Sequence, residues 1–207
     1  MTSTTCVVIE VETNSDYGWR KHVQGLCSLW FKGYIYNHAI DGLLTSLRRT
    51  NGEVDAIETI VQGLDGHFAL IYTAPEFTLA AGDRIRSIPL FYGEVGSRRI
   101  ISSSAETIRK RLQLTEHDID ADQALTFATS GFCFSGKTLY RAIQELKCGE
   151  FAVFKTIDGA PDFRRYYRYL PSRKASELTS TYPTALAESL NALFSKVADE
   201  GSGRCVV

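Results

Sequence analysis

The sequence predicts an α+β fold in which antiparallel hairpins alternate with amphipathic helices. Two apolar runs, residues 68–73 and 77–81, are separated by the short proline-containing segment 74–76, which is typical of a β-hairpin. Apolar residues recur at helical spacing over residues 40–47 and again over 53–62, which indicates helices with one buried face. Such a mixture favours two sheets packed face to face, with helices on their outer surfaces.

The first third of the chain contributes two strands and the start of the helical region. Residues 6–11 form a short apolar strand, and residues 26–35, rich in Leu, Trp, Phe and Tyr, form a second. Asn37 is placed to cap the helix that follows, because Asn is among the preferred N-cap residues. The pair Asn51-Gly52 interrupts this helix before it restarts.

The middle of the chain continues with short strands and short helices. Pro89 begins another apolar run, and residues 99–102 form a strand after a turn that contains glycine. We expect Ser104 and Asp120 to cap two helices, because Ser and Asp accept hydrogen bonds from the first free amides of a helix. Residues 150–155 form a further strand.

The last third of the chain predicts a boundary between two domains. Residues 163–169 are basic and aromatic, and we expect them to form an extended segment that crosses onto a neighbouring domain. Residues 182–199 form an amphipathic helix, and residues 204–207 begin an apolar strand. We therefore expect one domain over residues 1–170, and a linker, a helix and the first strand of a second domain over residues 171–207.

Composition excludes several classes of function. The 207 residues are 44% hydrophobic and 23% charged, enough for a substantial core. Lys plus Arg number 23 against 24 for Asp plus Glu, so we expect neither nucleic acid nor a membrane as a partner. Residues 1–5 do not form a secretion signal, and no apolar run is long enough for a spanning helix, which indicates a cytoplasmic protein.

The cysteines and histidines do not indicate a metal site. The five cysteines lack Cys-x-x-Cys spacing, so we expect neither bound zinc nor a disulfide framework, and we interpret each as a small core residue. They are Cys6, Cys27, Cys133, Cys148 and Cys205. His67 is expected to be an exposed strand residue.

The order of the central motifs resembles the N-terminal domain of glutamine-hydrolysing asparagine synthetases and β-lactam synthetases. The matching runs are Leu-Asp-Gly-His-Phe-Ala at 64–69, Asp-Arg at 83–84, Pro-Leu-Phe-Tyr at 89–92 and Ser-Ala-Glu at 104–106. The resemblance implies a class II glutamine amidotransferase domain with the Ntn-hydrolase fold, a four-layer αββα sandwich of two mostly antiparallel sheets. It also implies that the Asp-Arg pair is architectural and closes the end of the hairpin.

The resemblance implies a glutamine site that this chain carries only in degenerate form. Active members use an Asn-Gly-Glu-Ile-Tyr-Asn motif, in which Asn and Gly donate hydrogen bonds to the oxyanion and the acidic residue holds the substrate ammonium. Here the motif is Lys-Gly-Tyr-Ile-Tyr-Asn at 32–37, so Gly33, Tyr34 and Asn37 are its degenerate substrate-binding residues. Lysine lacks the amide, and losing one oxyanion donor costs roughly a hundredfold or more in rate.

The nucleophile of the family is also missing from its usual place. Active members expose an N-terminal Cys by removal of the initiator Met, and its own α-amino group serves as the base. Here Thr2 follows Met1. Two alternatives remain open: Thr2 becomes the terminal nucleophile after removal of Met1, or cleavage of a five-residue propeptide exposes Cys6.

Together these features predict a non-hydrolysing, mainly structural domain. The resemblance implies that it forms the N-terminal half of an ATP-dependent, amide-bond-forming ligase, as in the β-lactam, carbapenam and lasso-peptide synthetases. ATP and Mg²⁺ would belong to the missing synthetase half, because no Ser-Gly-Gly-x-Asp-Ser phosphate loop occurs in these residues. The segment itself is expected to hold no cofactor, and its own synthetase domain is the expected partner.

Two other functions stay open at this point. The domain could hydrolyse glutamine with Cys6 or Thr2 as nucleophile and supply ammonia to the synthetase half. It could instead be a non-enzymatic module that forms a homodimer or binds a partner through its sheet and residues 163–169.

Overall fold

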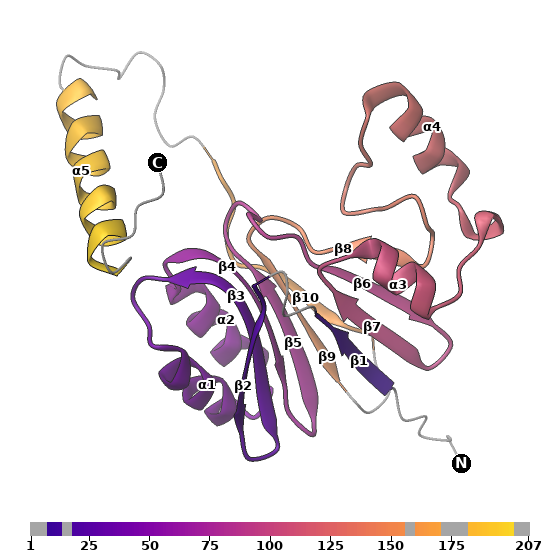
Figure 1. The fold of residues 1–207 in the computed structure, drawn as a ribbon, viewed down its shortest axis with the longest axis horizontal. Coiled ribbons are helices and arrows are strands. Elements are labelled where there is room, and N and C mark those ends of the chain that lie inside the picture. The colour runs from indigo at the N-terminus through magenta and orange to yellow at the C-terminus, as the bar shows by residue number, and fades with distance from the viewer. Residues whose placement is uncertain (1–7, 14–17, 156–159, 171–181, 201–207) are drawn as a thin grey trace. The chain divides into compact units, whose positions relative to one another are not determined.

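Two β-sheets form the framework of the chain, in a computed structural model that describes residues 8–13, 18–155, 160–170 and 182–200. The chain divides into two compact units, residues 1–168 and 169–207. Both sheets belong to the first unit (Figure 1). In spatial order the six-stranded sheet consists of β10 (Asp162–Arg165), β9 (Glu150–Lys155), β5 (Phe77–Gly82), β4 (Gly66–Thr73), β3 (Cys27–Ile35) and β2 (Arg20–Gln24).

The second sheet has four strands and contains the single parallel pair among the described residues. In spatial order its strands are β1 (Val8–Glu12), β7 (Arg98–Ser102), β6 (Phe91–Val95) and β8 (Ile143–Glu145). β1 runs parallel to β7, whereas the other neighbouring strands in both sheets run antiparallel. The sheets are therefore mostly antiparallel, as the sequence predicted.

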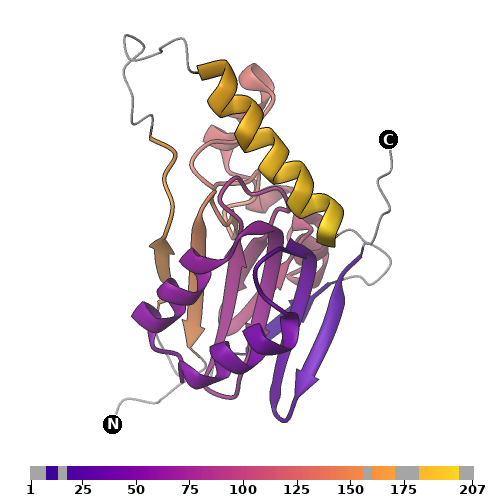
Figure 2. The same cartoon turned by 90° about the vertical axis from the view of Figure 1, so that its left-hand side faces the viewer.

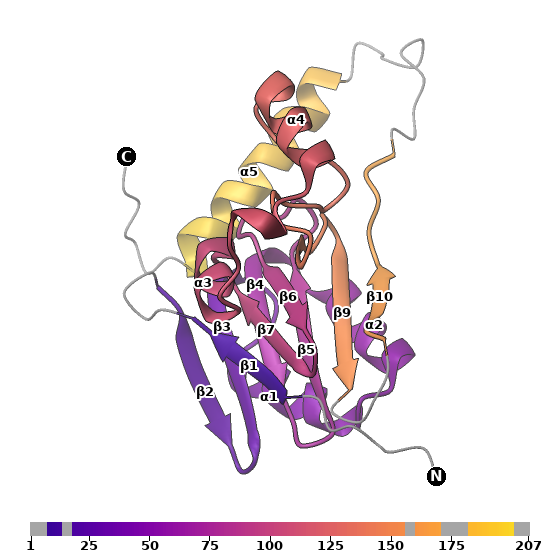
Figure 3. The same cartoon turned by 90° about the vertical axis from the view of Figure 1, so that its right-hand side faces the viewer.

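Helices cover the outer face of each sheet. Helices α1 (Ile40–Arg49) and α2 (Val54–Gly63) pack on the six-stranded sheet, where Leu43, Leu47 and Ile57 join one apolar cluster (Figure 2). Helix α3 (Ala105–Arg111) packs through Ile108 on the four-stranded sheet (Figure 3).

A third apolar cluster joins the two sheets. Both faces of strand β4 are buried, because its side chains alternate between two apolar clusters. Leu70 and Tyr72 point to the helix side, whereas Ala69 and Ile71 point to the other sheet. This alternation follows from the two-residue period of a β-strand. The layers are helix, sheet, sheet and helix, which confirms the predicted four-layer αββα sandwich.

Three further helices among the described residues do not belong to the four layers. They are the short 3₁₀ helix η2 (Glu116–Asp118), helix α4 (Ala121–Ser130) and, in the second unit, helix α5 (Tyr182–Glu200). α5 carries the predicted apolar stripe, and its members Leu186, Leu190, Leu193 and Phe194 are exposed. No helix in the described part of the chain is both long and apolar enough to span a membrane.

Two of the three predicted helix caps are confirmed. The Ser104 hydroxyl accepts a hydrogen bond from the Thr107 amide at 3.3 Å, and the Asp120 carboxylate accepts one from the Asp122 amide at 3.0 Å. The cap predicted at Asn37 is wrong, because α1 begins at Ile40 and has no side-chain cap.

The Asn37 side chain instead joins α2 to β4. Its Nδ2 donates to the Gly63 carbonyl at 2.8 Å, and its Oδ1 accepts from the Asp65 amide at 2.9 Å. This bridge uses both ends of the side-chain amide, whereas an N-cap uses only its oxygen.

Several short elements were absent from the sequence prediction. β2 has the sequence Arg-Lys-His-Val-Gln, so this edge strand offers no apolar run to detect. β8 has three residues and β10 has four, too few to establish a period. The predicted linker at 171–174 and the predicted strand at 204–207 lie outside the described residues.

Candidate functional site

The degenerate motif at 32–37 lies where β3 and β4 approach most closely. Gly33 has φ +101°, and a Cβ built on it would lie 2.1 Å from the His67 carbonyl oxygen. Across the pair, a Cβ on Gly66 would lie 2.1 Å from the Tyr34 carbonyl oxygen. A Cβ atom cannot lie this close to a carbonyl oxygen, so both positions require glycine. The two glycines shape the backbone at this end of the sheet.

Lys32 faces the space between the two sheets. On β3, Phe31 belongs to the helix-side cluster, whereas Trp30 packs in the cluster between the sheets. Because side chains alternate along a strand, Lys32 projects to the same side as Trp30. It lines two adjoining cavities of 660 Å³ and 540 Å³, which also share Ile88.

The larger of these cavities, which we call the serine cavity, is rich in hydroxyl groups. It is bounded by the end of β1 (Glu12 and Thr13), by Lys32 and by the segment that joins β7 to α3. The end of β7 supplies Ser102, the connecting residues are Ser103 and Ser104, and α3 supplies Thr107. From the sequence, Ser104 was predicted only as a helix cap, although three consecutive serines at 102–104 were a visible signal.

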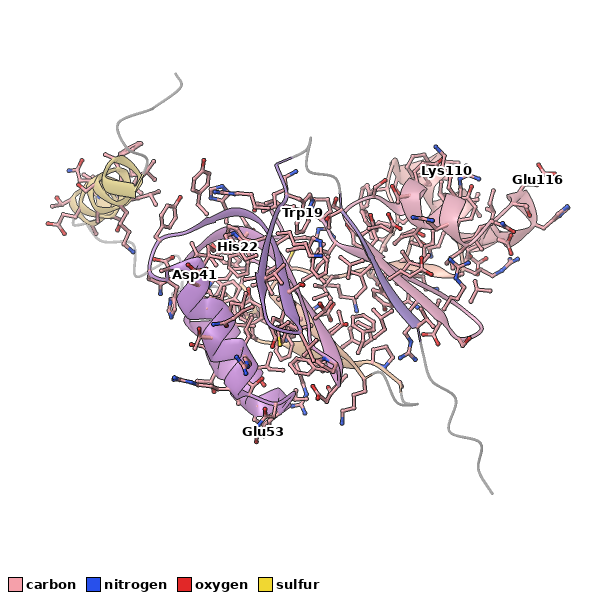
Figure 4. The ribbon with its side chains drawn as sticks, turned by 60° about the horizontal axis from the view of Figure 1, so that its bottom comes forward. Trp19, His22, Asp41, Glu53, Lys110 and Glu116 are labelled. Atoms are coloured by element: carbon pink, nitrogen blue, oxygen red, sulfur yellow. The ribbon has the colours of Figure 1, made fainter. Side chains whose placement is uncertain are left out.

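The smaller cavity, which we call the tryptophan cavity, lies along the other side of Lys32. Trp19 contributes to it and is buried between the sheets (Figure 4). Its Nε1 donates to the Ser103 hydroxyl at 3.1 Å. Arg20, Gly33, Tyr34 and His67 also line it. The structure thus brings Gly33 and Tyr34 of the predicted site to one cavity, together with Lys32.

Tyr34 and His67 form an aromatic pair at the rim. Their ring centroids lie 5.2 Å apart, and the Tyr34 side chain is 56% exposed. The prediction that His67 is exposed is wrong, since it is partly buried between the rings of Tyr34 and Tyr36. Its neighbours come from a strand distant in sequence, which a local pattern cannot reveal.

The third predicted substrate-binding residue, Asn37, does not line either cavity. Both ends of its amide bond to the backbone around Gly63 and Asp65. The structure therefore separates Asn37 from Gly33 and Tyr34.

The two candidate nucleophiles, Thr2 and Cys6, lie outside the described residues. The strand that follows them is informative, because β1 begins at Val8, whose amide donates to the Ser97 carbonyl at 3.0 Å. The opposite end of β1, at Glu12, pairs with Ser102 and lines the serine cavity. At about 3.3 Å per residue, the four steps from Val8 to Glu12 span about 13 Å.

Asp83 organises the turn that forms the cavity wall. Its buried carboxylate accepts hydrogen bonds from the amides of Phe68 (3.0 Å), Ile85 (2.9 Å) and Ser87 (3.2 Å), and from the Ser87 hydroxyl. The turn leads directly to Ile88, which both cavities share. These contacts agree with the architectural role expected for Asp83.

A third cavity, of 680 Å³, lies beside α4 and was missed from the sequence. Exposed Phe127, Phe132 and Phe134 line it, and Arg86 pairs there with Glu145 at 2.8 Å. Burial raises the pKa of Glu145, and the nearby Arg86 guanidinium opposes that shift. Three phenylalanines within eight residues were the available signal.

The cysteine interpretations have mixed outcomes, and the expectation of no metal site stays a prediction. In the described part of the chain, no group of three or more His, Cys, Asp or Glu side chains could hold a metal ion. Cys27 is buried, as expected. The interpretation of Cys148 and Cys133 as core residues is wrong, since the first is exposed and the second partly exposed. Both lie in connecting segments outside the strands and helices.

Comparison with known proteins identifies one family. A family model described as a glutamine amidotransferase domain matches residues 20–167. No curated protein matches the chain.

Two solved structures are similar over 72% of this chain at 15% identity. One is the glutamine phosphoribosylpyrophosphate amidotransferase from B. subtilis complexed with ADP and GMP, with a TM-score of 0.42 over 31% of that chain. The other, described as the allosteric regulatory enzyme of purine biosynthesis, has a TM-score of 0.37 over 30% of its chain. The aligned region covers about a third of each solved chain.

Proposed function

Because the chain belongs to the glutamine amidotransferase domain family, we propose that it is a glutaminase-like domain that no longer hydrolyses glutamine. In this proposal it serves as the structural N-terminal half of an ATP-dependent, amide-bond-forming enzyme of the asparagine synthetase type. The amidotransferase family predicted from the motif order is confirmed. The loss of hydrolysis and the synthetase half are proposals.

The observation that carries the proposal is the position of Lys32. It occupies the motif position of the oxyanion-donating Asn and lines both cavities between the sheets. An oxyanion donor must be held rigidly toward the developing charge, and losing one costs roughly a hundredfold or more. A lysine ammonium on a flexible four-carbon stem cannot replace a fixed amide.

The aromatic rim supports the loss of glutamine recognition. The family places a carboxylate at the position of Tyr34 to hold the substrate ammonium. Here an exposed phenol ring packs on His67 instead. A phenol side chain does not supply the carboxylate that pairs with an ammonium group.

ATP and Mg²⁺ do not fit the described residues of this chain. These residues contain no group of three or more possible metal ligands, and the sequence contains no Ser-Gly-Gly-x-Asp-Ser phosphate loop. We therefore assign both to the proposed synthetase half, and no step of this domain involves them.

The test is glutamate release from glutamine by the purified chain. We expect no release above the buffer background, and the same result for the variant Cys6→Ala. Intact mass should show a chain that retains residues 3–5. Hydrolysis that is abolished by Cys6→Ala or Thr2→Ala, but not by the control Cys148→Ala at an exposed cysteine, would refute the proposed loss.

A further inference from the structure

We propose that the serine cavity binds a small oxyanion, a carboxylate or a phosphate group, with Lys32 as its counter-ion. The proposal concerns what the cavity binds in place of glutamine. It depends on the cavity itself and does not require the proposed loss of hydrolysis.

The charge of the cavity favours an anion. Lys32 is partly buried, and it forms no hydrogen bond or ion pair with any described residue. A partly buried ammonium without a partner is unfavourable, because the low-dielectric surroundings weaken its hydration. A bound anion would remove this cost.

The other charged side chains that line the cavities in the described part of the chain do not pair with Lys32. Glu12 lines the same cavity, but its carboxylate is paired with the Arg111 guanidinium. Arg20 lines the adjoining tryptophan cavity and has no hydrogen-bond or ion-pair partner among the described residues. Among the described residues that line the two cavities, positive charge therefore exceeds negative charge.

The hydroxyl groups of the cavity are available as donors. The Ser102 oxygen accepts from the Ser104 amide at 3.1 Å, and the Ser104 oxygen accepts from the Thr107 amide at 3.3 Å. The Ser103 oxygen accepts from the Trp19 indole at 3.1 Å.

Each hydroxyl also has one proton to donate. None of the three serines donates that proton to a described residue, and neither does Thr107. Toward the described residues, each serine hydroxyl therefore accepts one hydrogen bond and donates none.

This pattern selects among ligand classes. A cation would meet an uncompensated lysine, and a neutral amide would leave the ammonium without a counter-charge. An oxyanion offers several acceptor lone pairs to the ammonium and the hydroxyl protons at once, and charge-assisted hydrogen bonds of this kind are roughly twice as strong as neutral ones. Carboxylate and phosphate share this chemistry.

The experiment titrates the full 207-residue chain with inorganic phosphate and, separately, with succinate, by isothermal calorimetry at low and high salt. We expect saturable binding of at least one anion, weaker at high salt. Lys32→Met should weaken binding tenfold or more, whereas Lys32→Arg should retain most of it. Lys155→Met, at an exposed lysine at the end of β9, is the matched control and should change nothing.

The outcomes separate the possibilities. Binding of phosphate alone identifies a phosphoryl ligand, binding of succinate alone identifies a carboxylate, and binding of both indicates an unselective oxyanion site; each supports the proposal. Absence of binding by a folded chain overturns it, as does binding that Lys32→Met leaves unchanged. Circular dichroism establishes that each variant is folded, and glutamate release in the same samples reports hydrolysis separately.

Discussion

Removing the carboxylate of Asp83 should destabilise the domain more than any exposed charge change. The perturbation is Asp83→Ala. In the native chain this carboxylate is 1% exposed and accepts from the backbone amides of Phe68, Ile85 and Ser87. The substitution removes the acceptor of all three amides at once.

The magnitude follows from the burial of those amides. A hydrogen bond to a charged group contributes about 1.5–3 kcal/mol, and a buried donor left without a partner costs a similar amount. The Phe68 amide is buried and bears the larger cost, about 2–3 kcal/mol, whereas the partly buried amides of Ile85 and Ser87 regain water at about 1 kcal/mol each. The sum is about 4–5 kcal/mol, or about 8–20 °C in Tm for a domain of this size.

Urea unfolding followed by circular dichroism measures this loss. Asp55→Ala is the matched control, because its side chain is 82% exposed and its contact with Arg164 is 3.9 Å long, so we expect a change within about 0.5 kcal/mol. If the free energy of unfolding of Asp83→Ala lies within about 1 kcal/mol of the value for Asp55→Ala, the buried hydrogen bonds do not have the assigned role. A genuine effect should also weaken anion binding, since the turn carries Ile88 into both cavities.

Two other changes test the geometry of the site and the sandwich. Gly33→Ala should lower the free energy of unfolding by at least about 2 kcal/mol, because the chain must accommodate both a left-handed backbone and a Cβ 2.1 Å from the His67 carbonyl oxygen. The midpoint of urea unfolding measures this loss. Burial, followed by the charges of Glu150 and Glu94, raises the pKa of Tyr92 to about 12. The unfolded chain therefore loses this proton from about pH 10, so the free energy of unfolding should fall between about pH 10 and 12 in urea titrations.

Each of these two predictions has its own control. Gly25→Ala has a positive φ of +62° but no atom within 4 Å of the new Cβ, so it should cost clearly less than Gly33→Ala. If both substitutions lowered the free energy of unfolding equally, the positive φ alone, and not the close approach of β4, would be the reason that position 33 requires glycine. Tyr92→Phe should make the alkaline decline less steep, and an unchanged slope would assign the decline to other groups.

The sequence predicted most of the elements correctly because their signals are local. The hairpin of β4 and β5, the apolar face of α1 and the caps at Ser104 and Asp120 each depend on a few neighbouring residues. Prediction failed where the partner is distant. Asn37 fits a helix cap by type, but its partners at Gly63 and Asp65 become available only after α2 has folded back onto β3.

The candidate site divides along the same line. From residue identity alone, the chain lacks the oxyanion Asn and the acidic anchor, since Lys and Tyr stand at 32 and 34. The sequence by itself therefore determined the family, the four layers and the altered chemistry of the motif.

The tertiary structure alone decided where those residues meet other groups. It turned Lys32 toward the space between the sheets, brought the three serines where β7 meets α3 to the same cavity, and set the start of β1 at the far end of the strand from that cavity. These are long-range juxtapositions that depend on how two sheets stack. No local pattern encodes them, because side-chain period and capping act over a few residues, whereas the contacts of the site join segments as far apart as Trp19 and Ser103.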